Sequence, residues 1–190
     1  VDVDGDRIFL DGKPFPRPFR SGPTCTSRLQ DGGQVFEGWS DGSVTSTSEG
    51  EYFSGDRQQS RAQGPSRNPI TQLLFCNGTL WSADTRGYLV AWAAGNGQLA
   101  LRQCIRLQFC SVLVLSAKND NLVALSANGI LSTVSTATEQ LRFVIDLGRQ
   151  VDNLAWENIG GLVAGRPNGA VLIDVRSGAL NAGNSDDAQT

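Results

Sequence analysis

The residues best placed to do chemistry at the start of this chain are three aspartates. Asp2, Asp4 and Asp6 stand at the first, third and fifth positions of a calcium-binding loop. Such a loop also needs a carboxylate that binds through both oxygens at its twelfth position, which here is Lys13. We therefore interpret these aspartates as an acidic turn at a strand edge and predict that the chain holds no metal there.

Other aspartates lie at or near predicted turns, and no two of them form a visible pair for general acid–base catalysis. An aspartate in a turn commonly accepts hydrogen bonds from nearby backbone N–H groups. The absence of His excludes imidazole-dependent triads, general bases and metal ligands. With no phosphate-binding, nucleophile-elbow or dinucleotide motif, the sequence predicts no catalytic residues, no enzyme activity and no cofactor. The aspartates expected to fix turns are Asp84, Asp120, Asp146, Asp152 and Asp174.

Cysteine is the remaining reactive side chain. Cys76, Cys104 and Cys110 lie inside apolar segments predicted as strands, where a reduced cysteine acts as a small buried hydrophobe. Neither these nor Cys25 form a CxxC spacing. We interpret all of them as free thiols, which favours a reducing compartment and an intracellular, cytoplasmic location. The alternative is a disulfide between Cys104 and Cys110 across a strand-to-strand turn.

Short apolar segments and tight turns repeat along the chain at a nearly constant interval. The turns are Asp41-Gly42, Arg86-Gly87, Asn128-Gly129 and Asn168-Gly169, and their glycines are 45, 42 and 40 residues apart (87−42, 129−87, 169−129). Each turn separates two apolar segments, which is the pattern of a β-hairpin. A hairpin every 40–45 residues predicts an all-β chain that forms a β-propeller of four-stranded antiparallel blades, with about four blades in these residues.

Two segments carry a family resemblance within residues 70–178. LLFCNGTLWSADTRGYLVAW and VDNLAWENIGGLVAGRPNGAVLIDVRSG resemble WD (WD40-like) repeats, in which a turn leads to a strand that ends in Trp-Asp. In the first, Trp92 takes the place of the repeat's Trp and Ala93 replaces the Asp; in the second, Ile173 replaces the Trp and Asp174 matches the Asp. No repeat contains the family's Gly-His pair. The resemblance implies a degenerate WD-repeat propeller that binds other proteins.

The same resemblance implies a position for partner binding. In a WD-type blade, the turn between the second and third strands and the connection to the next blade emerge on one face. Arg86 and Arg166 fall in the former and Arg149 in the latter, so we predict that they line one rim and bind an acidic partner peptide. A solvated surface rich in Arg is the alternative.

The chain divides into three parts by composition. Residues 1–32 are predicted to hold an N-terminal hairpin and an irregular segment, and residues 33–180 the blades. Residues 54–69, rich in Arg, Gln and Ser, are predicted to be a polar insertion between blades, and residues 181–190 a disordered tail. We expect Trp92 and Trp156, which stand in apolar strands, to pack between adjacent blades.

The net charge and the number of blades limit the kinds of partner that the chain can bind. A net charge of −3 predicts no direct binding to nucleic acid. Apolar runs such as SVLVLSA fall far short of the ~20 residues of a membrane-spanning helix. Four blades are only part of the ring of about seven that the resemblance implies, so an apolar face and strand edges would be exposed.

The sequence therefore favours a non-catalytic interaction scaffold in a larger assembly. Its propeller would be completed by other sequence, by a partner or by another copy. A closed four-bladed ring is a further possibility. The alternative function is a secreted propeller enzyme or carbohydrate-binding module, to which the hairpin LDGKPF gives weak support.

Overall fold

The computed structural model describes residues 2–4, 7–10, 13–14, 24–28, 34–48, 60–95, 98–107, 111–148, 151, 153–157, 161–166 and 169–182. Every regular element within these residues is a β-strand. No helix long and apolar enough to cross a membrane occurs among them.

Four antiparallel sheets of four strands each make up most of the described chain. We number them as blades 1 to 4. Blade 1 contains β4 (Cys25–Arg28), β5 (Gln34–Gly38), β6 (Ser43–Ser48) and β7 (Ser60–Gln63). Blade 2 contains β8 (Ile70–Cys76), β9 (Thr79–Asp84), β10 (Tyr88–Gly95) and β11 (Gln98–Arg106). Blade 3 contains β12 (Val112–Lys118), β13 (Asn121–Ser126), β14 (Ile130–Ser135) and β15 (Gln140–Asp146). Blade 4 contains β16 (Asn153–Trp156), β17 (Gly161–Arg166), β18 (Gly169–Asp174) and β19 (Leu180–Ala182).

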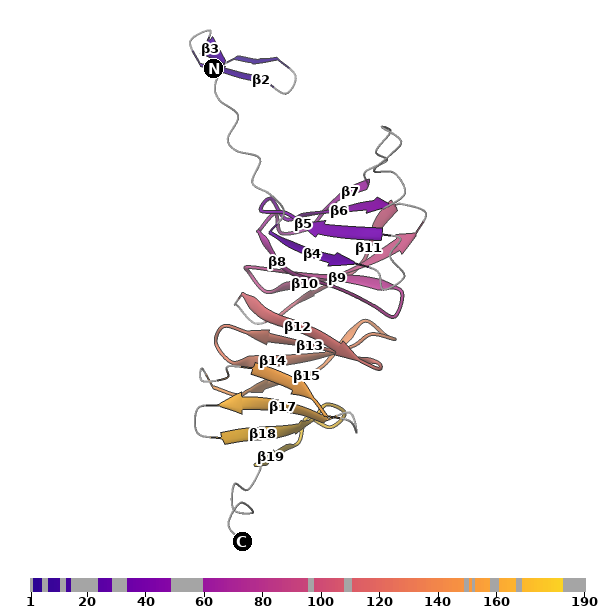
Figure 1. Ribbon diagram of the computed structural model, residues 1–190, viewed down its shortest axis with the longest axis vertical. Coiled ribbons are helices and arrows are strands. Elements are labelled where there is room, and N and C mark those ends of the chain that lie inside the picture. The colour runs from indigo at the N-terminus through magenta and orange to yellow at the C-terminus, as the bar shows by residue number, and fades with distance from the viewer. Residues whose placement is uncertain are drawn as a thin grey trace.

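Each blade is a meander in which consecutive strands pair, and the blades stack in chain order along the long axis of the molecule (Figure 1). Blade 1 and blade 4 lie at opposite ends of the stack (Figure 1). The first strands of blades 1, 2 and 3 lie beside one another, as successive inner strands of a propeller do. The prediction of an all-β, partial propeller with four four-stranded blades is confirmed.

Two details of the predicted division are wrong. Strand β4 lies within residues 1–32 but belongs to blade 1. Strand β7 lies within the predicted insertion 54–69 but is the fourth strand of blade 1, where Val44 pairs with Ala62. The segment SRAQ has a single small apolar residue, so its sequence does not resemble a strand. Residues 54–59 lie outside the described part of the chain.

The two ends of the chain also differ from the prediction in part. Strands β1 (Asp2–Asp4), β2 (Arg7–Leu10) and β3 (Lys13–Pro14) form a separate three-stranded sheet, in which β2 and β3 are the predicted hairpin. Strand β19 includes the first two residues of the predicted tail. The rest of the tail lies outside the described residues.

Successive side chains along the second strands of blades 2 and 3 point into the cores on opposite sides of the blade. We call the side of a blade toward the previous blade its preceding face and the opposite side its following face. Along β9, Leu80 packs in a core with blade 1 and the next residue, Trp81, packs in a core with blade 3. Along β13, Leu122 packs toward blade 2 and Val123 toward blade 4. A strand buried on both faces needs apolar residues at successive positions, as these strands have.

A tryptophan packs in or against two of the cores between blades. Trp92 is 1 % exposed in the core between blades 1 and 2, and its Nε1 donates to Ser82 Oγ at 2.8 Å. Trp156 packs against the core between blades 3 and 4, and its Nε1 donates at 2.8 Å to Ser116 Oγ of blade 3. The prediction that Trp92 and Trp156 pack between blades is confirmed.

Threonine hydroxyls link the inner edges of the first three blades. Thr71 Oγ1 lies 3.3 Å from the carbonyl oxygen of Ala83 in its own blade and 3.0 Å from that of Val112 in blade 3. Thr24 makes the same two contacts one blade earlier, with Gly38 and Ile70. The corresponding register shift in blade 3 falls at Leu113, which has no hydroxyl and is 54 % exposed. The joint between blades 3 and 4 therefore lacks this link.

Candidate interaction surfaces

Three of the aspartates considered for acid–base catalysis stabilise turns by accepting backbone hydrogen bonds. Asp84, Asp146 and Asp174 each accept the backbone N–H two residues ahead, at 2.8, 2.8 and 2.9 Å. Hydrogen bonds from Ser177 and from the backbone lower the pKa of Asp174. The predicted role is confirmed at these three positions and stays a prediction for Asp120 and for Asp152, which lies outside the described residues. Among the described side chains, no three His, Cys, Asp or Glu residues group as metal ligands would.

The described cysteines are free thiols. Cys25, Cys76 and Cys104 are half-buried, and none forms a disulfide with another described residue. Burial raises the pKa of Cys76 to about 11. Burial is also the largest cause that raises the pKa values of Cys25 and Cys104. Thiols with such pKa values are protonated at neutral pH and react slowly. Cys110 lies outside the described residues, so its alternative pairing with Cys104 stays open.

The three arginines predicted to bind a partner are described to different degrees. Arg86 is exposed in the turn after β9, where its backbone N–H is held by Asp84. Arg166 ends β17, so its backbone lies at the corresponding end of blade 4, with blade 3 between. Arg149 lies outside the described residues. A shared rim of the three stays a prediction.

The stack ends on one side in a polar surface, the preceding face of blade 1. Phe36 and Val44 of this blade point into the core with blade 2, so the alternate residues of β5 and β6 point the other way. We name this surface the N-terminal end face. Its residues are Val35, Glu37, Trp39, Thr45, Thr47, Arg61 and Gln63.

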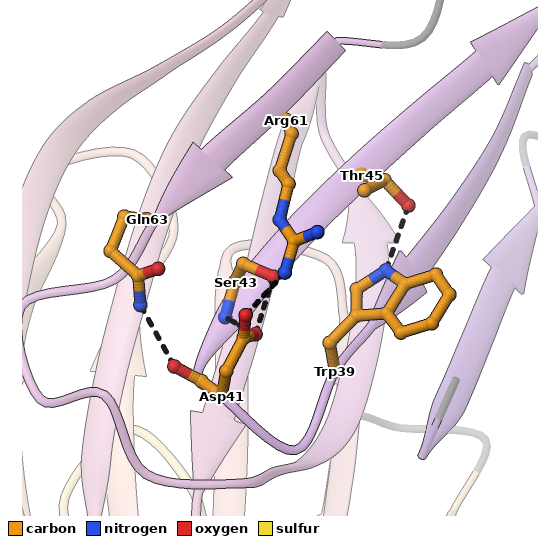
Figure 2. A network of polar contacts seen from close by, with 6 residues as sticks. All are labelled: Trp39, Asp41, Ser43, Thr45, Arg61 and Gln63. Carbon is orange, nitrogen blue, oxygen red and sulfur yellow. Dashed lines mark hydrogen bonds and ion pairs between the residues drawn. The ribbon is translucent and has the colours of Figure 1, made fainter. Parts of the chain in front are cut away.

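Hydrogen bonds and a cation–π contact connect the side chains of the N-terminal end face (Figure 2). Trp39 Nε1 donates to Thr45 Oγ1 at 3.0 Å, and Thr45 Oγ1 donates to Glu37 Oε2 at 3.3 Å. The guanidinium of Arg61 lies 5.8 Å from the centre of the Trp39 ring and forms an ion pair with Asp41. Trp39, Thr45, Glu37 and Arg61 therefore have partners on this surface without another blade.

Asp41 anchors the edge of that face. Its Oδ1 accepts hydrogen bonds from the backbone N–H and the hydroxyl of Ser43 at 3.0 and 2.6 Å, and its carbonyl accepts one from Gln63 (Figure 2). Partial burial opposes ionisation of Asp41, but the Ser43 bonds and the charge of Arg61 outweigh it and lower the carboxyl pKa. The Arg61 and Asp41 side chains are 53 % and 51 % exposed, so this charge pair is solvated.

The opposite end of the stack is an apolar surface, the following face of blade 4. Leu162, Ala164 and Ile173 point into the core with blade 3, so the alternate residues point outward. We name this surface the C-terminal end face. Its residues are Ala155, Val163, Gly165, Ala170 and Leu172.

A row of apolar side chains crosses three strands of the C-terminal end face. Ala155 of β16 pairs with Val163 of β17, which pairs with Leu172 of β18. Ala155 is exposed, and Val163 and Leu172 are only partly buried. A Cβ atom at Gly165 would lie 2.2 Å from Asn153 Oδ1, so the amide of Asn153 lies over this glycine. The surface is therefore flat, apolar in the middle and polar at its rim, as many protein interfaces are.

Corresponding positions of neighbouring blades show how the two end faces differ. Gly42 and Gly87 occupy the same turn in blades 1 and 2, so each residue of blade 1 corresponds to the one 45 positions later (87−42). Val90 and Trp92 of the buried preceding face of blade 2 thus correspond to Thr45 and Thr47 on the N-terminal end face. The sequence predicts an exposed apolar face but not the residues that form it. It does not predict the polar N-terminal end face, although the run SVTSTS, compared with YLVAW, carries that signal.

Comparison with known proteins shows the fold. No family model matches this chain, and no curated protein matches it. The chain is similar to Saccharomyces cerevisiae Sqt1 (TM-score 0.67, 14 % identity, 84 % of this chain and 48 % of that one). It is similar to a chain of the Mitotic Checkpoint Complex (TM-score 0.64, 14 % identity, 82 % and 48 %). It is also similar to the computationally designed Ika4 protein (TM-score 0.62, 19 % identity, 82 % and 92 %).

The similar proteins differ in how much of their own length this chain covers. The chain spans about half the length of the Sqt1 and Mitotic Checkpoint Complex chains and 44 % of the designed Ika8 chain, which it matches with a TM-score of 0.60. It spans nearly all of Ika4. The four sheets are propeller blades, and they correspond to only part of the longer propellers.

Proposed function

We propose that this chain is a non-catalytic, WD-like propeller scaffold that acts as a subunit of a larger protein assembly. One observation carries the proposal: the C-terminal end face is apolar and no described blade covers it. The following faces of blades 1, 2 and 3 are each buried in a core with the next blade. A sheet face of this kind exposed to water marks an interaction surface or an aggregation risk.

The comparisons add support to a partial propeller. The Sqt1 and Mitotic Checkpoint Complex chains are about twice as long as the matched region, and the second belongs to a complex by its title. In our proposal further blades extend this stack. The blades then act as a rigid frame that presents loops, with Arg86, Arg149 and Arg166 offered to an acidic peptide. The free thiols support an intracellular, cytoplasmic location.

The test is made on the chain alone, by fluorescence of a hydrophobic dye and by light scattering over a range of concentrations. We expect dye binding or self-association. Leu172→Glu, on the C-terminal end face, should reduce both signals. Thr47→Glu, on the already polar N-terminal end face, is the matched control and should change neither. A monodisperse wild-type chain that binds no dye would contradict the proposal.

A second measurement separates the proposal from the alternative of a secreted propeller. Alkylation under non-reducing conditions, followed by mass spectrometry, should label Cys25, Cys76, Cys104 and Cys110 as free thiols once the chain is unfolded. A disulfide between Cys104 and Cys110 would instead favour the secreted module.

A further inference from the structure

We infer, on the basis of the proposed function, that the partner seated on the C-terminal end face is a further propeller blade whose preceding face carries large aliphatic and aromatic side chains. A second copy of this chain presents instead a face on which Trp39 lies among the charged side chains of Glu37, Arg61 and Asp41. The inference follows from how the three existing joints are built and from the chemistry of the two end faces.

Each existing joint follows one rule. The following face of blade 1 is covered by Leu80, Val90 and Trp92 of blade 2. The following face of blade 2 is covered by Leu122 and Val134 of blade 3, and that of blade 3 by Leu162 and Ile173 of blade 4. In every case the covering face is apolar. The C-terminal end face continues this series in position, strand order and apolar character.

The size of the side chains on the C-terminal end face indicates the size of those that cover it. Face-to-face sheets lie about 10 Å apart, and protein cores are packed without large voids. Blade 4 contributes only Ala155, Val163, Leu172 and small neighbours to that space. The covering face must therefore fill most of it. At the joint between blades 1 and 2, the side chain of Ile70 of blade 2 lies against Gly38, which has none.

The N-terminal end face of a second copy does not meet these requirements. Head-to-tail contact would place Val163 and Leu172 against Glu37, the Arg61–Asp41 pair and Trp39, which is hydrogen-bonded to the buried Thr45. Removing charged groups from water without new partners is costly. Contact between two C-terminal end faces would pair a following face with a following face, whereas each of the three cores pairs a following face with a preceding face.

The experiment extends the full chain by one blade and measures whether the C-terminal end face becomes covered. Ala155→Cys places a reporter thiol on that face, and its rate of maleimide labelling is read by peptide mass spectrometry. One chain carries a copy of blade 3 (residues 111–148) after residue 182. The matched chain carries a copy of blade 1 (residues 24–63) at the same place. Cys76, which is half-buried within blade 2, reports in each sample whether the parent blades stay folded.

We expect the appended copy of blade 3 to slow labelling of the reporter at least tenfold, because its preceding face carries Leu122 and Val134. The appended copy of blade 1 should leave the rate unchanged. A third chain then tests the chemistry directly. Here the appended blade 1 carries Glu37→Ser, Thr45→Val and Thr47→Trp, the residues of blade 2, and we expect it to regain the protection.

Other results would overturn the inference. Equal protection by all three appended blades would show that bulk and polarity do not select the occupant. No protection by either the blade 3 copy or the substituted blade 1 copy, with Cys76 labelled as in the parent, would show that no such blade binds. A reporter that is protected in the unextended chain and released on dilution would identify a second copy as the occupant and leave the proposed function standing. A reporter already protected in a monomer would contradict the proposed function itself.

Discussion

The outer faces of the two end blades differ in polarity. At the N-terminal end face, Trp39, Arg61 and Thr45 satisfy one another and leave a polar surface that is stable in water. At the C-terminal end face, Val163 and Leu172 lie where the other blades bury their partners. Terminal repeats of a stacked protein need a polar outer side, and only blade 1 has one. Of the two end faces, only the C-terminal one resembles the faces that the other blades bury.

The largest expected effect comes from comparing a tryptophan between blades with one on an end face. Trp92→Ala should lower the free energy of unfolding by about 3–5 kcal/mol, because it leaves a cavity in a core and an unpaired Ser82 hydroxyl. Trp39→Ala should cost about 1 kcal/mol, since its ring is only partly buried. Urea unfolding of both variants measures the difference. Equal losses would show that the N-terminal end face is a buried core.

Changing the polarity of the N-terminal end face should change the oligomeric state. Thr45→Val with Thr47→Trp gives blade 1 the residues of blade 2 at these positions. We expect head-to-tail association with the C-terminal end face of another copy, at least tenfold tighter than in the wild type, or about 1.4 kcal/mol. Analytical ultracentrifugation measures it. Adding Leu172→Glu should reverse the association, and its persistence would mean that the contact lies elsewhere.

The two end blades also differ in how they are attached, and Leu113→Thr tests this difference. A threonine at this position would supply the hydroxyl that Thr24 and Thr71 supply at the other joints. It would also remove a large exposed apolar side chain. We expect a stabilisation of about 0.5–1.5 kcal/mol, with slower hydrogen exchange in β16 and β17. Faster exchange there would show that Leu113 itself holds the joint.

The smallest effect concerns acid stability at the N-terminal end face. Because the folded-state pKa of Asp41 is lowered, its contribution is complete above the unfolded value of about 3.9 and is lost as the pH falls through the folded value. The exposed pair with Arg61 contributes roughly 0.2–1 kcal/mol. Compared with Asp41→Asn, the wild type should be more stable at pH 6 and lose that advantage below about pH 4. Thermal melts of both proteins at pH 6 and below about pH 4 measure this. A difference in stability between them that does not depend on pH would contradict it.

The sequence predicts the hairpins because their chemistry is local. Gly42, Gly87 and Gly129 all have positive φ angles in the structure, between 78 and 79°, a backbone conformation that glycine adopts without strain. Their spacing therefore marks the blades. Strand β7 is different, since SRAQ becomes a strand through its pairing with β6 and not through its own residues.

The end faces could not be predicted in the same way. Whether Thr47 or Val163 lies at a joint or at an end depends on how many blades are present, and no local pattern specifies that number. The arginine rim depends in addition on loops between blades, and Arg149 lies in one of them. Periodicity thus predicts what each blade is, and the contacts between blades decide which surfaces remain free.

The one-way stacking of these meanders has a consequence for synthesis on the ribosome. Within each blade, every strand pairs with its neighbour in sequence, so each blade can form as soon as its last strand emerges. Of the four blades, blade 1 emerges before the others, and its preceding face is polar. Each later blade then covers the apolar side of the one before it. Among the four described blades, the exposed apolar face is therefore always that of the blade made last, which limits the time and area available for aggregation.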